Sequence, residues 1–219
     1  MYVKLKLPMA NAQMSISAVI TGDLIDSQSA QDTHAYIAQL KATLDQLAGL
    51  FDFKAEQYRG DGFQLTLVAP ERAFECAVLL RAGLIANSPE GERFDARIAI
   101  GIGAAPSENH YGGAFVLSGQ GLDGMKKTTL GIFSHARQLL DRIELPTEFV
   151  AVIIEGWTRV EAETYFLHAT QHASQKDLAK TLGKSRVTVH KALQRANAEL
   201  IDRYLERTRA WIQELQDAR

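Results

Sequence analysis

The chain contains 219 residues, of which 46% are hydrophobic and 23% are charged, and its net charge at neutral pH is −2. This composition is typical of a globular protein and excludes collagen-like and low-complexity disordered chains, while the length allows one or two domains. No apolar run approaches the ~20 residues of a membrane span, so we expect a cytoplasmic protein without a membrane partner.

The first predicted element is a strand that follows an N-terminal extension, residues 1–13. This extension lacks the apolar core of a secretory signal. The stretch SISAVITGDLIDS alternates into an apolar strand that ends near Thr21. Apolar residues at steps of three and four then predict an amphipathic helix that Asp32 is suited to cap. These residues are Ala35, Ile37, Leu40, Leu44, Leu47 and Leu50.

A hairpin, a helix and two further strands are predicted next. FKAEQY and FQLTLVA flank the turn RGDG, a pattern that indicates two paired strands. A helix over residues 71–86 contains the single cysteine, Cys76, whose apolar neighbours predict a buried thiol. FDARIAIGIGAA predicts a buried strand, residues 116–127 a weaker helix and LGIFS a last strand.

This order of elements predicts the fold class α+β. The order β-α-β-β-α-β is the ferredoxin-like arrangement, which we expect as an antiparallel sheet with helices on one face. We assign it to residues 14–144. Strand signals then stop and Pro146 marks the break, so residues 145–219 are expected to form an all-α domain with a long final helix.

Residues 174–193, SQKDLAKTLGKSRVTVHKAL, contain two short helical patterns joined by a turn at Gly183. Ser174 and Ser185 are suited to cap the two helices, and glycine tolerates a left-handed turn. These features, with apolar residues to hold the pair together, are the requirements of a helix-turn-helix. The apolar residues are Leu178, Ala179, Leu182, Val189 and Leu193. Residues 157–197 resemble the helix-turn-helix of sigma-factor-like regulators.

The second helix of this motif is the predicted contact with double-stranded DNA, because its N-terminal half enters the major groove in a helix-turn-helix. Residues 174–209 carry a net charge of +5 and the remainder carries −7, a distribution that favours a nucleic-acid partner for the C-terminal part. The alternative is a helical hairpin with a solvated charged face. The predicted DNA-binding residues are Lys184, Ser185, Arg186, Thr188, His190, Lys191 and Arg195.

Three aspartates form a candidate metal site. Asp23 and Asp26 follow the first strand, and Asp61 lies in the hairpin turn. A ferredoxin-like sheet brings these two places side by side, and carboxylates are the ligands that Mg²⁺ prefers in phosphoryl chemistry. The alternative is turn chemistry, since aspartate before glycine is favoured in tight turns.

Over residues 15–125 the stretches TGDLIDS, RGDG and RIAIGIG resemble the class III nucleotide cyclases. The resemblance implies a nucleotide ligand. However, GAFVLSGQGL has Leu117 and Gly121 where that family has an asparagine and a transition-state arginine, and loss of a positioned arginine lowers phosphoryl-transfer rates by orders of magnitude. We therefore expect a degenerate sensor domain. The alternative is an active metal-dependent enzyme that uses Asp23, Asp26 and Asp61.

AVITGDLIDSQ, YRGDGFQL and GGAFVLSGQGLDGMK also resemble the SatD family of bacterial transcriptional regulators, over most of the chain. The resemblance implies a DNA-binding transcriptional regulator. We expect a homodimer, because a dimer that binds symmetric half-sites gains affinity that a lone helix-turn-helix lacks. The apolar stripe of the last helix is suited either to the chain's own core or to a second copy. That stripe is Ile201, Tyr204, Thr208, Trp211 and Leu215.

Overall fold

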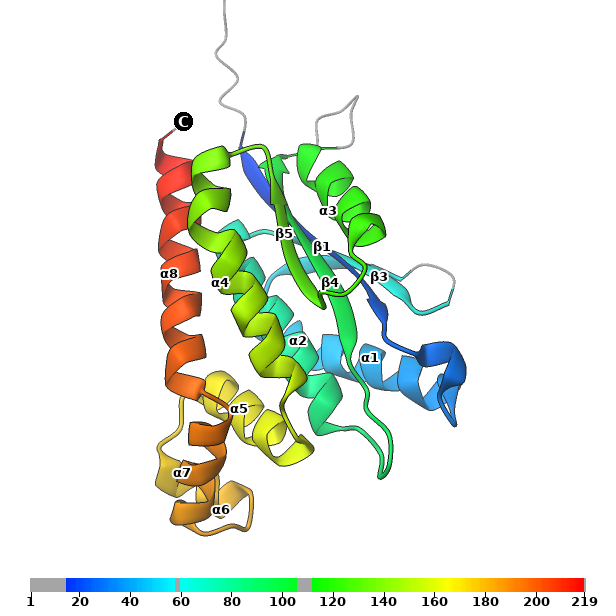
Figure 1. The fold of residues 1–219 in the computed structure, drawn as a ribbon. Coiled ribbons are helices and arrows are strands. Elements are labelled where there is room, and N and C mark those ends of the chain that lie inside the picture. The colour runs from blue at the N-terminus through cyan, green and yellow to red at the C-terminus, as the bar shows by residue number, and fades with distance from the viewer. Residues whose placement is uncertain (1–14, 58–59, 106–111, 219) are drawn as a thin grey trace, which may run out of the picture.

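The computed structural model describes residues 15–57, 60–105 and 112–218. This part of the chain forms a five-stranded sheet and eight α-helices (Figure 1), so the predicted mixture of α and β structure is confirmed. The strands are β1 (Ile16–Leu24), β2 (Phe53–Gln57), β3 (Gly62–Leu67), β4 (Ala96–Ala104) and β5 (Leu130–Ser134). The helices are α1 (Thr33–Leu47), α2 (Ala73–Ala86), α3 (Gly113–Gly124), α4 (Arg137–Glu155), α5 (Arg159–Gln171), α6 (Gln175–Thr181), α7 (Arg186–Arg195) and α8 (Ala198–Asp217), with short 3-10 turns η1 (Ser27–Ser29) and η2 (Pro70–Arg72).

The sheet has the strand order β2-β3-β1-β4-β5. Neighbours among β1 to β4 pair antiparallel, whereas β5 pairs parallel with β4. The last predicted strand therefore forms a parallel edge strand. Asp32 caps α1 as predicted, because its side chain accepts a hydrogen bond of 2.9 Å from the backbone N–H of Ala35.

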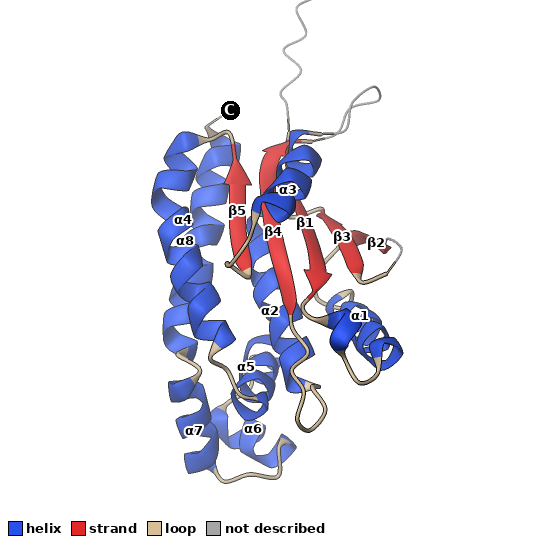
Figure 2. Cartoon of the chain, turned by 45° about the vertical axis from the view of Figure 1, so that its right-hand side comes forward, coloured by secondary structure: helices blue, strands red, loops and turns tan. Residues whose placement is uncertain are grey.

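Helices cover both faces of the sheet, so the prediction of helices on one face is wrong. α2 packs on one face and α3 on the other (Figure 2), where Ala99 of β4 belongs to a small buried cluster with Leu122 of α3 and Met125. A Cβ atom at Gly101 would lie 2.2 Å from the backbone oxygen of Ala114. The glycine therefore lets α3 approach β4 more closely than a side chain would allow.

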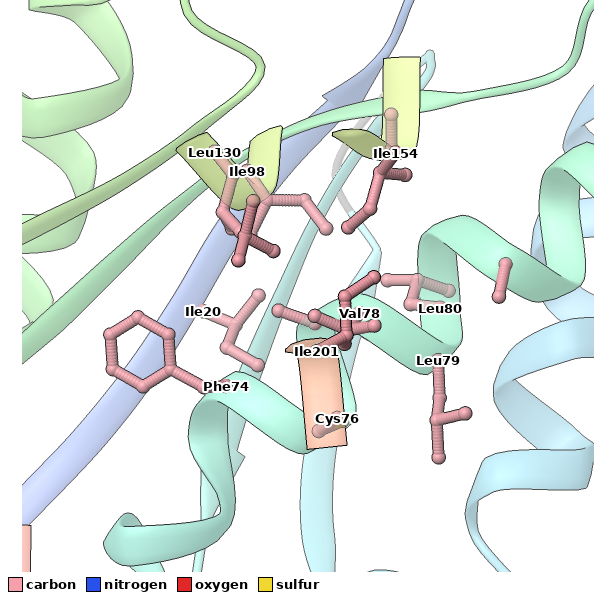
Figure 3. Packing of buried hydrophobic residues seen from close by; sticks show 14 of the residues in the cluster. Ile20, Phe74, Cys76, Val78, Leu79, Leu80, Ile98, Leu130, Ile154 and Ile201 are labelled. Carbon is pink, nitrogen blue, oxygen red and sulfur yellow. The ribbon is translucent and has the colours of Figure 1, made fainter. Parts of the chain in front are cut away.

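α2 lies at the centre of the hydrophobic core. Ile98 of β4, Ile154 of α4 and Ile201 of α8 gather around Val78 of α2 (Figure 3), and all four belong to one buried cluster. Cys76 is fully buried as predicted, and desolvation raises the pKa of its thiol to about 12. Residues from both sides of the predicted domain boundary therefore share one core.

α4 passes through that boundary. It includes Pro146 in its interior, so the break predicted there is wrong. Proline removes one backbone hydrogen bond and disfavours a helix interior, but the buried side chains of Ile143 and Val150 hold α4 on the core on both sides of it. The proposed division between residues 144 and 145 falls inside this helix, and the division into two domains stays a prediction.

The apolar stripe of α8 packs on the chain's own core. Ile201, Tyr204 and Thr208 are buried, and a hydrogen bond of 2.8 Å joins the hydroxyls of Tyr204 and Thr147 of α4. Of the two alternatives for this stripe, self-packing is the one that the chain adopts. Within the described residues, no helix is both long and apolar enough to cross a membrane.

Candidate nucleic-acid interface

α6 and α7 have the predicted caps and turn. The Ser174 side chain accepts a hydrogen bond of 3.3 Å from the backbone N–H of Asp177, and the Ser185 side chain accepts one of 3.1 Å from that of Thr188. Between the helices Gly183 has a φ of +62°, a conformation that glycine adopts without strain. The sequence thus contains the local signals that start each helix and turn the chain between them.

The inner faces of α6 and α7 are apolar and buried. Leu178 and Val189 are completely buried, and Ala179 and Leu193 are nearly so. Val187, on the same helix as Val189, is by contrast 62% exposed. α7 therefore has distinct packing and solvent faces.

The solvent face of α7 carries most of the predicted DNA-binding side chains. Arg186, Thr188, His190 and Lys191 are all exposed. Arg186 and Lys191 form no ion pair with any residue that the structure describes. Arg186 is the first residue of α7, where the helix dipole also favours an anion, and Lys191 lies in the middle of the helix.

Two of the predicted DNA-binding residues instead contact α5. The Lys184 ammonium donates to Glu163 at 3.2 Å, and the Arg195 guanidinium donates to Glu161 at 2.7 Å. Burial acts to raise the pKa of Glu161, but hydrogen bonds from Thr158 and Arg195 outweigh it and lower the pKa. The basic groups at both ends of α7 are therefore paired with carboxylates of α5 in the same chain.

Two further lysines extend the basic surface. Lys176 and Lys180 are exposed on α6, and neither was among the predicted DNA-binding residues. Both contribute to the positive charge of the C-terminal segment, which was the signal that could have identified them. Helix-turn-helix geometry directs attention to the second helix, whereas the first helix commonly crosses the DNA backbone.

Asp23 is not free to bind a metal in this structure. Both of its carboxylate oxygens accept hydrogen bonds from Arg97, at 3.1 and 2.6 Å. Arg97 also donates to the backbone oxygen of Met125 at 2.6 Å, and its bond to Asp23 raises the pKa of the guanidinium. Arg97 of β4 thus joins Asp23 of β1 to the end of α3.

Asp26 and Asp61 lie together at an open hollow beside η1. Asp26 has a φ of +54° at the start of η1, and the hydroxyl of Ser27 donates to the Asp61 carboxylate. Across the described ranges, no three acidic, histidine or cysteine side chains are grouped so that they could hold a metal ion. With Asp23 bound by Arg97, a Mg²⁺ site made by all three aspartates stays a prediction.

No protein-family model matches the sequence, and a comparison with curated protein sequences finds no similar chain. The resemblance to the SatD family therefore stays a prediction. Among solved structures, the active GGEEF domain of a diguanylate cyclase from Vibrio cholerae is similar to this chain, with a TM-score of 0.44 and 14% sequence identity. The alignment covers 56% of this chain and 85% of that domain.

Proposed function

We propose that the protein is a DNA-binding transcriptional regulator in which α6 and α7 form a helix-turn-helix. The observation that carries the proposal is the pair of exposed cations, Arg186 and Lys191, which lack an acidic partner among the described residues. They lie on the solvent face of a helix whose other face is fixed by buried Val189. Such a helix can enter the major groove without disturbing its own packing.

The distribution of ion pairs around α7 leaves cations available for a ligand between two engaged ends. Glu161 and Glu163 neutralise the cations at the two ends of α7, Arg195 and Lys184. No acidic residue of the described chain pairs with Arg186 on the face between them. Lys or Arg side chains without an acidic partner are available to bind phosphates or guanine edges.

The proposal includes a SatD-like role for the whole chain. The sheet then serves as a degenerate cyclase-like sensor domain, with a nucleotide as its candidate ligand, in a cytoplasmic homodimer that binds symmetric half-sites on double-stranded DNA. The support for this part is the sequence resemblance alone.

The first test is selection of duplex DNA from a randomised pool by the full chain, followed by affinity measurements between 50 and 200 mM salt, the range over which ~6–10 phosphate contacts weaken binding by about 10³–10⁵-fold. We expect a selected sequence whose affinity falls steeply as salt rises, because bound counterions are released. Failure to enrich any sequence, with no salt-dependent binding, would reject the proposal.

The alternative is a metal-dependent nucleotide-processing enzyme that uses Asp23, Asp26 and Asp61. It has less support, because Arg97 binds both carboxylate oxygens of Asp23. Incubation with nucleoside triphosphates and Mg²⁺ or Mn²⁺ separates the two functions. Product formation that Asp61→Ala abolishes, while the fold is retained, would favour the enzyme.

The oligomeric state is tested separately. Sedimentation at micromolar concentration should detect a dimer, either free or on a duplex with two half-sites about one helical turn apart. A monomer under both conditions would count against the homodimer and leave DNA binding by a single copy to be judged from the affinity measurements.

A further inference from the structure

We propose that Trp157 and Arg93 are positioning residues that hold α7 in a fixed orientation relative to the sheet. DNA affinity then depends on both residues although neither lies on the solvent face of α7. The inference rests on the proposed function and concerns how the DNA-binding helix is held.

The first link joins α7 to Trp157. The indole N–H of Trp157 donates a hydrogen bond of 2.9 Å to the backbone oxygen of Ala196, the C-cap residue directly after α7. The last carbonyls of a helix have no partner within it, so an external donor there fixes the helix end. Trp157 is only 2% exposed, and its ring packs on that of Tyr165 with centroids 5.0 Å apart.

The second link joins Trp157 to Arg93. The Arg93 guanidinium donates to the backbone oxygen of Trp157 at 2.7 Å and to that of Ile154 at 2.9 Å. The same group donates to Asp95 at 3.1 and 3.3 Å. Arg93 therefore fastens the turn between α4 and α5 to the residue that precedes β4.

Asp95 is the fixed point of this chain of bonds. It is buried, and Arg81, also buried, donates to both of its carboxylate oxygens at 2.8 Å. Its backbone oxygen accepts bonds from the Tyr36 hydroxyl at 2.6 Å and from the Ile25 N–H at 3.0 Å. Buried charges persist only when such bonds satisfy them, so Asp95 cannot shift without breaking several bonds at once.

The remaining polar contacts of α7 with the body of the protein are weaker constraints. The Lys184 and Arg195 pairs involve side chains that are 28% and 59% exposed, and water competes with partly exposed ion pairs, as it does at Arg93, which is 38% exposed. The bond from Trp157 is buried and joins the helix end directly. Its loss leaves the oxygen of Ala196 without that partner and allows α7 to tilt on α5.

The test compares Trp157→Phe, which removes the indole N–H and keeps an aromatic ring, with Tyr204→Phe, which removes a buried hydroxyl that bonds Thr147 outside this chain of bonds. We expect Trp157→Phe to weaken binding to a selected duplex by about 2- to 30-fold, the range typical of coupling through residues that do not touch the ligand. The slope of log affinity against log salt should also become shallower, because a tilted α7 loses phosphate contacts. Tyr204→Phe should lower stability and leave the slope unchanged.

Arg93→Lys provides a second variant if Trp157→Phe does not fold. Lysine keeps the charge, but one ammonium cannot reproduce the fork that reaches two carbonyls and Asp95, so the slope should again become shallower. The salt slope is the informative measurement, since simple destabilisation reduces the active fraction without changing the contacts of folded molecules.

Three results are decisive. A shallower slope in both variants, with faster amide hydrogen exchange in α7, supports the inference. Unchanged affinity and slope in folded variants of a DNA-binding wild type overturn it and leave the proposed function standing. If the wild type does not bind DNA, the proposed function fails, and unchanged hydrogen exchange in α7 of Trp157→Phe then rejects the positioning role as well.

Discussion

Glu161 joins two helices through one carboxylate, and its contacts make stability depend on pH. Thr158 donates to one oxygen through its backbone N–H and hydroxyl, each at 2.8 Å, while Arg195 of α7 donates to the other. These bonds favour the ionised form and lower the pKa of Glu161 in the folded chain, against the effect of burial. The carboxylate therefore stabilises the fold above the unfolded pKa of about 4.3.

We predict that Glu161→Gln lowers the free energy of unfolding by about 1–2 kcal/mol at neutral pH, through loss of a charge-assisted cap and ion pair. Because the folded pKa is lowered, the difference from wild type should shrink as pH falls below about 4 and vanish below the folded pKa. Denaturant titrations at a series of pH values measure it. Glu163→Gln alters a carboxylate that is more exposed than that of Glu161, so it is the matched control and should change stability little.

A glycine at the contact between β4 and α3 and a glycine on the open side of α3 should respond oppositely to alanine. A Cβ atom at Gly101 would meet the backbone of α3, whereas one at Gly119 would have no atom within 4 Å. We expect Gly101→Ala to destabilise the fold by about 1–3 kcal/mol through overpacking. Gly119→Ala should be neutral or stabilising by up to about 1 kcal/mol, since alanine favours a helix interior. Equal effects in thermal unfolding would contradict the close approach of α3 to β4.

At the scale of a single helix, two valines of α7 differ in burial, and one serves as the control for the other. Val189 is completely buried and Val187 is exposed. We predict that Val189→Ala destabilises the fold by about 1–3 kcal/mol, through lost burial and a residual cavity, and that Val187→Ala changes stability by less than about 0.5 kcal/mol. Chemical denaturation checks both. A large effect at Val187 would show that the packing face of α7 has been assigned wrongly.

Local signals in the sequence predicted α6 and α7 well, whereas contacts between residues distant in the sequence could not be predicted from it. Ser174, Gly183 and Ser185 act on residues at most a few positions away, so their roles can be read from the chain. The continuation of α4 past Pro146 depends on packing against distant elements. The bond between Asp23 and Arg97 joins residues 74 positions apart, and no short motif indicates it.

The position of α3 likewise depends on a long-range contact that could not be predicted from the sequence. Its helical pattern predicted a helix at roughly the observed place, but not the face of the sheet that it covers. That choice depends on Gly101 of β4, whose lack of a side chain opens a surface on the second face. The glycine was visible in the sequence, yet its partner, Ala114, became known only from the fold.

For the molecule as a whole, one continuous core implies cooperative unfolding. Ile154 and Ile201 from the helical segment pack with α2 and the sheet. We predict that thermal unfolding followed by far-UV circular dichroism coincides with unfolding followed by tryptophan fluorescence, as in a two-state transition. The two tryptophans, Trp157 and Trp211, both lie in the helical segment. Two separate transitions would instead support division into independent domains.

The central claim is that α7 binds DNA through its solvent face, and a double substitution tests it most directly. Arg186→Ala with Lys191→Ala removes the two unpaired charges and leaves the buried face of α7 intact. Lys126→Ala with Lys127→Ala removes two exposed charges between α3 and β5 and serves as the matched control. At low salt we predict that the α7 variant binds a selected duplex at least about tenfold more weakly than wild type, since such contacts each contribute about 1–3 kcal/mol, and that the control binds normally. Unchanged binding by a folded Arg186→Ala, Lys191→Ala variant would contradict the account and show that this face is only a solvated surface.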